Sequence, residues 1–218
     1  MELFGNLNEL IFPERCTACN ALGFSICPEC RRKWNLHRYI TTVGKTFDNQ
    51  IQVTSSVIYS TIAQKILLSA KESHIKRADQ LVSEAIRHST LNILRNVEID
   101  LLVPIPSRPK AVRKRGRQFI YEITEPISIE FNIPIAPILR HTRSVRDQSD
   151  LHHNERWNNL QDAFVVDAKQ LSGQKALLVD DLVTTGATLC EAARALRYAG
   201  IEVIGAVTAA VALATKIE

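Results

Sequence analysis

The stretch that decides the fold runs Leu177-Leu178-Val179-Asp180-Asp181-Leu182-Val183-Thr184-Thr185-Gly186-Ala187-Thr188-Leu189. The apolar run at 175–179 is typical of a buried parallel strand. Apolar residues then recur at helical spacing over 186–199, with Gly200 just past the expected helix end. Two acids and a hydroxyl-rich turn therefore lie where a strand passes into a helix, and this corner predicts an α/β fold.

The chemistry of this corner is that of a sugar-phosphate site. Backbone N–H groups at the helix start and the three threonine hydroxyls can surround a phosphate, whose charge the helix dipole favours. Gly186 lets the backbone approach closely. The carboxylates of Asp180 and Asp181 can accept hydrogen bonds from sugar hydroxyls or bind a hydrated metal ion.

Two alternatives fit the corner less well. The polar residues could merely cap the helix, but one cap residue suffices for that. Nucleotide hydrolases and dinucleotide-binding enzymes carry GxxxxGK[ST] or GxGxxG loops, and neither pattern occurs in this chain.

Length and composition agree with one α/β domain plus a small appendage. A chain of 218 residues with 45% hydrophobic residues can bury a substantial core. The longest apolar stretch, 203–214, is interrupted by Gly205 and Thr208 and is too short to span a bilayer, and the first four residues lack the basic start of a secretory signal. We therefore expect a cytoplasmic protein without membrane insertion.

Four of the five cysteines form two CxxC pairs, Cys16 with Cys19 and Cys27 with Cys30. Each pair can bend around one side of a tetrahedral ion, and clustered thiols in a reducing compartment favour metal over disulfides. We expect a structural four-cysteine zinc knuckle within residues 1–36, since four thiolates leave no open position for chemistry. The alternatives are iron, a redox dithiol or a site that has lost its metal, and Cys190 is expected in the core.

A second anion site is predicted after the apolar strand at 101–106. Six basic residues fall within ten positions that contain no acid: Arg108, Lys110, Arg113, Lys114, Arg115 and Arg117. Pro106 and Ser107 would form a rigid irregular turn with exposed N–H groups, next to the cations Arg108 and Lys110. Pyrophosphate fits such a corner, and an ordinary solvated basic helix is the alternative.

The remaining pattern predicts the other elements of the chain, of which residues 53–218 are taken as the phosphate-binding domain. Apolar spacing indicates helices at 3–11, 62–71 and 79–94, a basic helix start around 113–118, and strands at 53–59, 133–139, 163–166 and 202–212. Residues 38–52 are interpreted as a linker or a hairpin. The result is a mostly parallel sheet of about five strands with helices on both faces and a ligand at the strand carboxyl ends. The polar segment 140–159, with Arg140, Arg143 and Gln148, is expected to be a mobile lid.

Taken together, these motifs resemble the ComF family of competence-associated, phosphoribosyltransferase-like proteins. The residues that carry the resemblance are the two CxxC pairs, Val103-Pro104-Ile105-Pro106, Arg115-Gly116-Arg117-Gln118, Arg140-x-x-Arg143 with Gln148, Arg156-x-x-Asn159, Ala163-Phe164 and the stretch 177–189. Lys71 matches a lysine common in that family. The resemblance implies a type I phosphoribosyltransferase core, an N-terminal zinc finger and a role in natural transformation or DNA uptake.

The stretch 177–189 also resembles the motif by which type I phosphoribosyltransferases bind 5-phosphoribosyl 1-pyrophosphate (PRPP). The resemblance implies that Asp180 and Asp181 contact the ribose hydroxyls and that the turn holds the 5-phosphate through Val183, Thr184, Thr185, Gly186, Ala187 and Thr188. Mg²⁺ with Pro106, Ser107, Arg108 and Lys110 would hold pyrophosphate, and Asp180, Asp181 and Arg108 would be catalytic. The lid residues Arg140, Arg143 and Gln148 would cover the reacting centre.

Two functions follow from this interpretation. The first is a transferase in which electrostatic stabilisation and positioning supply the catalysis. The second is a non-catalytic competence factor that binds single-stranded DNA, acts with other DNA-uptake proteins, and keeps the PRPP pocket as a sensor or scaffold. The basic segment 108–117 and Trp34, as a stacking ring, support the second function.

Overall fold

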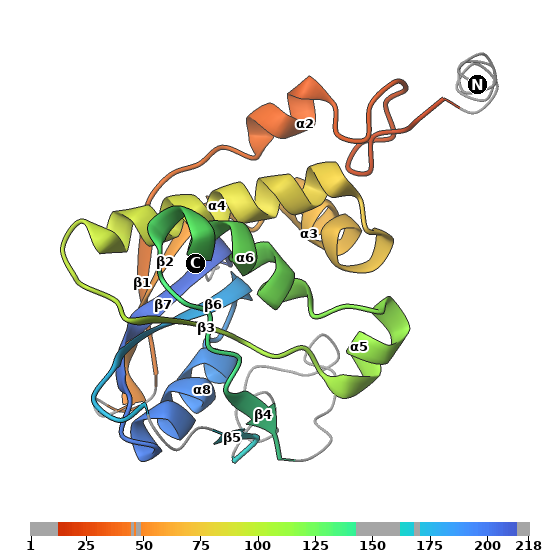
Figure 1. Ribbon diagram of the computed structural model, residues 1–218. Helices are drawn as coiled ribbons and strands as arrows, with labels where there is room; N and C mark the ends of the chain where they lie inside the picture. The colour runs from red at the N-terminus through yellow and green to blue at the C-terminus, as the bar shows by residue number, and fades with distance from the viewer. Residues whose placement is uncertain (1–12, 45, 47–48, 143–161, 168–170, 213–218) are drawn as a thin grey trace.

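The computed structural model describes residues 13–44, 46, 49–142, 162–167 and 171–212. Its centre is a five-stranded sheet in the order β1-β2-β7-β6-β3 (Figure 1). The strands are β1 (Tyr39–Val43), β2 (Ile51–Ile58), β3 (Leu101–Pro104), β6 (Lys175–Val183) and β7 (Glu202–Val211). β1 runs antiparallel to β2, and every other pairing in this sheet is parallel. The expected mostly parallel sheet is therefore confirmed.

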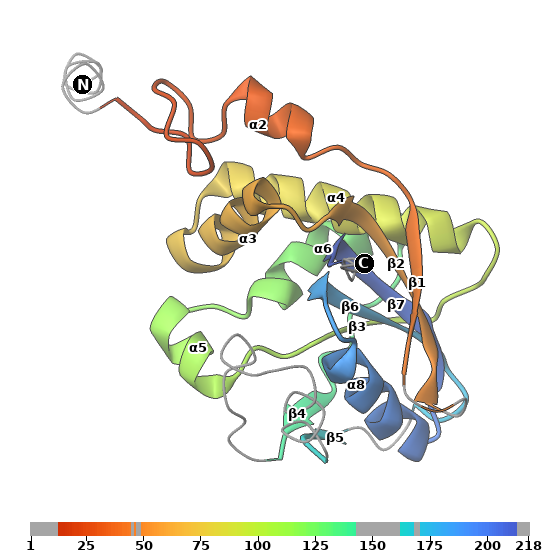
Figure 2. The same ribbon diagram turned by 180° about the vertical axis from the view of Figure 1, so that it is seen from behind.

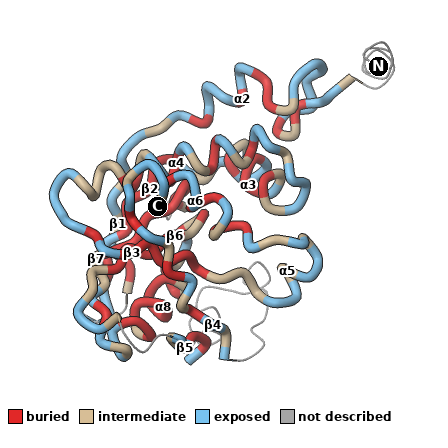
Figure 3. Tube along the Cα trace, viewed as in Figure 1, coloured by how far each residue is buried: buried red, intermediate tan, exposed pale blue. Residues whose placement is uncertain are grey.

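Helices cover both faces of this sheet, as the front and back views show (Figures 1 and 2). One face carries α3 (Thr61–Ser73), α4 (Lys76–Leu94) and α6 (Phe119–Phe131), and the other carries α8 (Ala187–Tyr198). The sheet thereby divides the apolar interior into two cores, one containing Ile66 and Ile86 and the other Leu189 and Leu196. Figure 3 shows that the buried positions concentrate in the strands and on the inner sides of these helices. A strand such as β6 is apolar on both sides because both of its faces are covered.

The helices expected at 62–71, 79–94 and 186–199 correspond to α3, α4 and α8. In the region 38–52, the hairpin interpretation is confirmed, because β1 and β2 pair antiparallel across it. β1 lies outside both predicted ranges, 1–36 and 53–218, and the division of the chain at those positions stays a prediction. The helix expected at 3–11 lies outside the described residues.

Two predicted strands are placed differently. The strand expected at 133–139 is wrong, because Pro134 and Pro137 cannot donate to a ladder and Ile135 makes only an isolated bridge to Leu102. A shorter strand, β4 (Leu139–His141), follows it, and β5 (Phe164–Val166) pairs antiparallel with β4. These two strands form a separate small sheet and do not join the main one.

The basic segment forms its helix earlier than expected. α5 (Pro109–Arg115) begins with proline in its first turn, where a missing N–H costs nothing, and ends at Gly116, whose φ is 75°. The helix start expected at 113–118 falls between α5 and α6, and α6, which contains Pro126, was given no range from the sequence. α5 has no buried residue and lies at the edge of the molecule (Figure 3).

The N-terminal knuckle packs on α3 and α4 through Trp34, which follows α2 (Pro28–Lys33). Trp34 is 4% exposed, and its Nε1 donates a hydrogen bond to the carbonyl of Leu81 at 3.2 Å. Nearby, Lys65 Nζ donates to the carbonyl of Ala18 at 2.8 Å. Trp34 is therefore a docking residue, and the expectation that it offers an exposed ring for stacking on DNA is wrong.

None of the helices in the described parts of the chain combines the length and the apolar character needed to cross a membrane.

The burial of Trp34 generates a stability prediction. Trp34→Ala should lower the free energy of unfolding by about 3 to 5 kcal/mol, because it empties a large buried site. Trp34→Phe should lower the free energy of unfolding by less, because an aromatic ring still fills part of the site, although the hydrogen bond to Leu81 is lost. Urea unfolding measures both, with Leu22→Ala as the control because Leu22 is 54% exposed. A Trp34→Ala variant as stable as the control would contradict this packing.

Candidate functional site

A cavity of about 600 Å³ opens at the carboxyl ends of β3 and β6. The two strands pair in parallel from Leu101 with Ala176 to Pro104 with Val179, and Ile105 N–H then donates to the Val179 carbonyl at 2.9 Å. This register brings the turn that follows β3 beside the two acids of β6. The described residues that line the cavity include Tyr59, Gln64, Leu68, Lys71, Glu72, Pro106, Ser107, Arg108, Arg115, Phe119, His141, Phe164 and residues 180–189.

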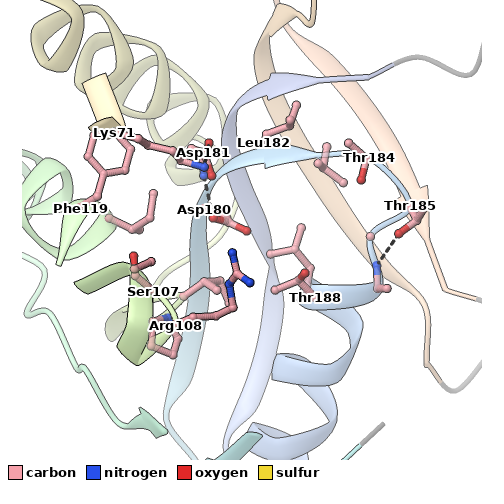
Figure 4. Close-up of a pocket in the computed structure, with 18 of the residues that line it drawn as sticks. Lys71, Ser107, Arg108, Phe119, Asp180, Asp181, Leu182, Thr184, Thr185 and Thr188 are labelled. Carbon is pink, nitrogen blue, oxygen red and sulfur yellow. Dashed lines mark hydrogen bonds and ion pairs between the residues drawn. The ribbon is translucent and has the colours of Figure 1, made fainter. Parts of the chain in front are cut away.

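The hydroxyl-rich turn forms one wall of this cavity (Figure 4). Gly186 has a φ of 75° and is the N-cap of α8, and a Cβ atom there would collide with the Val43 side chain. The Oγ1 of Thr185 accepts a hydrogen bond from the N–H of Ala187 at 3.3 Å, while Thr184 is exposed. The start of a twelve-residue helix therefore opens into the cavity, with backbone N–H groups and a favourable dipole for an anion.

The turn after β3 forms the opposite wall. Pro106, Ser107 and Arg108 all line the cavity, and the Arg108 guanidinium points toward Asp180 (Figure 4). The N–H of Ser107 is held by Gln118, whose Oε1 accepts its hydrogen bond at 3.2 Å. Lys110 is exposed on α5 and is not among the described residues that line the cavity. The predicted second anion corner thus faces the first across one space.

Two arginines of the basic segment 108–117 form ion pairs within the protein. Arg117 donates hydrogen bonds to both carboxylate oxygens of Asp79, at 2.8 and 2.9 Å, and a third to the carbonyl of Ala70. Arg115 pairs with Glu72 at 2.5 Å. These two arginines tie α5 and the following loop to α3 and α4, so the charge that remains for a ligand is smaller than the count of basic residues suggests.

The two acids at the end of β6 differ in their surroundings. Asp181 is 5% exposed and forms an ion pair with Lys71 of α3, with Nζ and Oδ2 2.5 Å apart. Asp180 is half-buried, and its Oδ1 accepts a hydrogen bond from the N–H of Asp181 at 2.9 Å. In Figure 4, Asp180 lies between Asp181 and the Arg108 guanidinium.

These surroundings shift the two carboxyl groups in opposite directions. Burial and the neighbouring charge of Asp181 raise the pKa of Asp180 well above its usual range. Burial also acts to raise the pKa of Asp181, but the charge and hydrogen bond of Lys71 outweigh it, so that this pKa is lowered. The two neighbouring carboxyl groups therefore release their protons at different pH, Asp181 before Asp180.

The predicted lid is only partly described. Arg140 is exposed, pairs with Asp167 at 2.6 Å, and does not line the cavity among the described residues. It borders a smaller cavity of about 220 Å³. Arg143 and Gln148 lie outside the described residues.

Tyr59 and His141 are among the lining residues that the sequence reasoning missed. Tyr59 follows β2 at the carboxyl end of the sheet. His141 ends β4, its Nε2 lies 3.2 Å from the Pro106 carbonyl, and its buried Nδ1 has no hydrogen-bond partner within the described part of the chain. Burial lowers the pKa of His141, so this imidazole is neutral at physiological pH. No local motif marks either residue, and only the fold brings them to the cavity.

The four knuckle cysteines form a second site, away from this cavity. Their sulfur atoms all lie within 4.8 Å of one another, and none is in a disulfide. Backbone N–H groups point at the sulfurs, with Cys27 donating to Cys16 Sγ at 3.4 Å. Although burial opposes it, the backbone hydrogen bonds bring the pKa of Cys16 down to about 6. A tetrahedral ion with bonds of about 2.3 Å to sulfur needs sulfurs about 3.8 Å apart, so this donor set can hold a metal ion such as zinc.

The raised pKa of Asp180 predicts a stability gain from Asp180→Asn. In the wild type, the carboxyl group of Asp180 loses its proton at a lower pH in the unfolded chain than in the folded protein. The free energy of unfolding therefore falls as the pH rises from the unfolded pKa through the folded pKa. The variant should therefore be more stable than wild type at pH 7 to 8, because the neutral amide has no charge to bury beside Asp181. The gain should shrink toward pH 4, as urea unfolding across that range would show. A variant less stable than wild type at neutral pH would contradict the assignment.

Comparisons with known proteins agree with this geometry. The phosphoribosyl transferase domain family model matches residues 79–218. Competence protein F of Haemophilus influenzae is 29% identical over 108 residues, which cover 48% of this chain and 47% of that protein, so the chain spans about half the length of the curated relative. The resemblance to ComF proteins expected from the sequence is confirmed by this similarity.

Solved structures with detectable likeness include an adenine phosphoribosyltransferase, at a TM-score of 0.46 and 14% identity, with 84% of this chain and 88% of that chain covered. Another is the adenine phosphoribosyl transferase of Trypanosoma brucei in complex with AMP, pyrophosphate and ribose-5-phosphate, at a TM-score of 0.44 and 11% identity over 80% and 87% of the two chains. The family match, which covers more than half of the chain, and the sheet topology confirm the expected fold class. The chain belongs to the phosphoribosyl transferase domain family.

Proposed function

We propose that this protein binds PRPP together with Mg²⁺ and transfers its phosphoribosyl group to an acceptor. The observation that carries the proposal is the convergence of two anion-binding corners and a carboxyl pair on one cavity. The turn after β6 suits a 5-phosphate, the turn after β3 suits a pyrophosphate, and Asp180 lies between them. A cavity of about 600 Å³ is also within the usual range for a small-molecule site.

In this proposal the turn from Val183 to Thr188 holds the 5-phosphate through N–H groups and hydroxyls. The ribose hydroxyls donate hydrogen bonds to the carboxylates of Asp180 and Asp181. Pyrophosphate lies against Ser107 and Arg108, and Lys110 contributes long-range positive charge from α5.

The reaction breaks the bond between ribose C1 and the pyrophosphate oxygen. Positive charge develops on the ribose and negative charge on the leaving pyrophosphate, while the acceptor forms the new bond at C1. Asp180 and Asp181 stabilise the ribose side, and Arg108 stabilises the departing pyrophosphate, so catalysis rests on placed charges. The partly exposed oxygens of Asp180 suit Mg²⁺, which would neutralise phosphate charge when bound with the substrate. The lid residues Arg140, Arg143 and Gln148 are proposed to close over this centre.

The cellular role is a separate part of the proposal. The name of the Haemophilus influenzae relative supports a role in competence for this chain, and we extend this proposal to DNA uptake. The free thiols of the knuckle support a reducing compartment, which is where a cytoplasmic protein would act.

A direct single-stranded DNA-binding function has one supporting observation. Basic side chains of Lys110, Arg113 and Lys114 are exposed on α5 and would attract a phosphate backbone. The burial of Trp34 removes the aromatic ring that stacking would require. We therefore rank this function second.

The carboxyl pair gives the direct test of PRPP binding. The double variant Asp180→Asn with Asp181→Asn should bind PRPP at least about 100-fold more weakly than wild type, because each lost charged hydrogen bond is worth about 1.5 to 3 kcal/mol. Calorimetric titration with PRPP and Mg²⁺ measures the difference.

The matched control is Glu202→Gln, an acid-to-amide change on an exposed residue at the far end of β7. It should leave the affinity unchanged. Equal affinity of the folded double variant and the wild type would refute the proposed ribose contacts. Absence of PRPP binding to the wild type would refute the function itself.

The four-cysteine group is proposed to hold structural Zn²⁺, because four sulfur ligands leave no open position for catalysis. Wild-type protein should contain about one zinc ion per chain, and Cys19→Ser should lose most of it. Elemental analysis measures the metal, and a lowered thermal midpoint should accompany its loss, because the knuckle packs on α4 through Trp34. Cys190→Ser is the control, since Cys190 lies in α8 outside the cluster. Full zinc content in Cys19→Ser, or iron in the wild type, would contradict this assignment.

A further inference from the structure

The cavity has a third wall, formed by α3, that neither anion corner uses. Gln64, Leu68, Lys71 and Glu72 line the cavity and lie on one face of this helix, spaced by three or four residues or adjacent. Tyr59, at the end of β2, lines the same cavity. With phosphates in the other two corners, this wall is where an acceptor would meet the ribose.

Lys71 is the cation that α3 presents on this wall, where the other charged residue, Glu72, is paired with Arg115. Its ion pair with Asp181 uses one of the three N–H groups of the ammonium. The Lys71 side chain is 27% exposed and that of Asp181 only 7%, so a ligand arriving from the cavity meets the ammonium before the carboxylate. Asp181 in turn fixes the position of Nζ.

Lys71 stays protonated in these surroundings. Burial acts to lower the pKa of Lys71, but the carboxylates of Asp181 and Asp180 outweigh it and the pKa is raised. Arg115, another cation that lines the cavity, is paired with Glu72. Lys71 is therefore a charged donor at neutral pH, and it cannot accept a hydrogen bond.

The surroundings of Lys71 are partly apolar. Leu68 lines the cavity and half of its surface is exposed, and the half-buried ring of Tyr59 lines the same cavity, while the fully buried Phe119 ring lies behind them beside Lys71 (Figure 4). A pocket that combines flat apolar surface with one fixed polar group suits an aromatic heterocycle and fixes its orientation.

We propose that Lys71 is a specificity-determining residue of the acceptor subsite: its ammonium, positioned by Asp181, donates a hydrogen bond to a ring carbonyl or anionic oxygen of a heterocyclic acceptor. The inference rests on the proposed function and names the chemistry of the second substrate. An acceptor with an amino group at that place would bring two donors against each other and leave the ammonium N–H that faces the acceptor without a hydrogen-bond partner, which is costly in a site that excludes water.

Hypoxanthine and adenine are matched probes, because they differ in carrying an oxo or an amino group on the same ring. Each is titrated into full-length protein saturated with ribose 5-phosphate, pyrophosphate and Mg²⁺, which fill the two corners without allowing transfer. Wild type should bind hypoxanthine about tenfold more tightly than adenine, which is the usual effect on affinity of one hydrogen bond from a charged donor. Lys71→Met should lose about tenfold in affinity for hypoxanthine and less than about twofold for adenine. Lys71→Arg should retain most of the preference.

The control variant is Lys76→Met, which removes an exposed lysine of α4 outside the cavity lining. It should behave as wild type. Thermal unfolding of each variant is recorded, because Lys71→Met leaves Asp181 without its partner.

Equal losses for both probes in Lys71→Met, an unchanged preference in that variant, or an adenine preference or binding of neither probe in the wild type would overturn the inference. The preference of the wild type for hypoxanthine over adenine tests the inference even if Lys71→Met does not fold. A protein that fails to bind ribose 5-phosphate and pyrophosphate would instead refute the proposed function, so the two failures are distinguishable.

Discussion

The site depends on the parallel pairing of β3 with β6. Because these neighbouring strands run in the same direction, their carboxyl ends meet at one edge of the sheet. The chain leaves β3 through Pro106, Ser107 and Arg108, and it leaves β6 through the turn that opens α8. Two separate turns, each suited to an anion, thus border one cavity. Gly186 is essential to this arrangement, because its left-handed backbone bends the chain into α8 where a side chain would strike Val43 of β1.

A second constraint is the balance of charge around the two acids. Asp181 is tolerated in the interior because Lys71 lies against it, and removing either partner would leave a buried charge alone. Burial and the neighbouring charge of Asp181 raise the pKa of Asp180. The ion pair that joins α3 to β6 also places a cation on the cavity wall, so the packing of this helix and the chemistry of the cavity are linked.

The sequence predicted the parts of the site that lie within single motifs. The strand, turn and helix at 175–199 and the two CxxC pairs were recognisable because each combines a local pattern with a local chemistry. The sequence did not predict His141 or Tyr59, which reach the cavity only through the tertiary fold. It also misplaced Trp34, since a tryptophan can stack on a ligand or pack on a neighbouring helix, and only the contact with Leu81 decides. β5 was wrongly assigned to the main sheet, because an apolar run in the sequence does not show which strand it pairs with, and β5 pairs with β4.

The most direct measurement is a crystal structure of the protein with PRPP and Mg²⁺. The account predicts the 5-phosphate on the turn from Val183 to Thr188 and the pyrophosphate beside Ser107 and Arg108. The ribose hydroxyls should lie against the carboxyl pair, and Lys71 should remain in contact with Asp181. Electron density for PRPP at any other place, or a cavity that stays empty at saturating PRPP, would contradict the central claim.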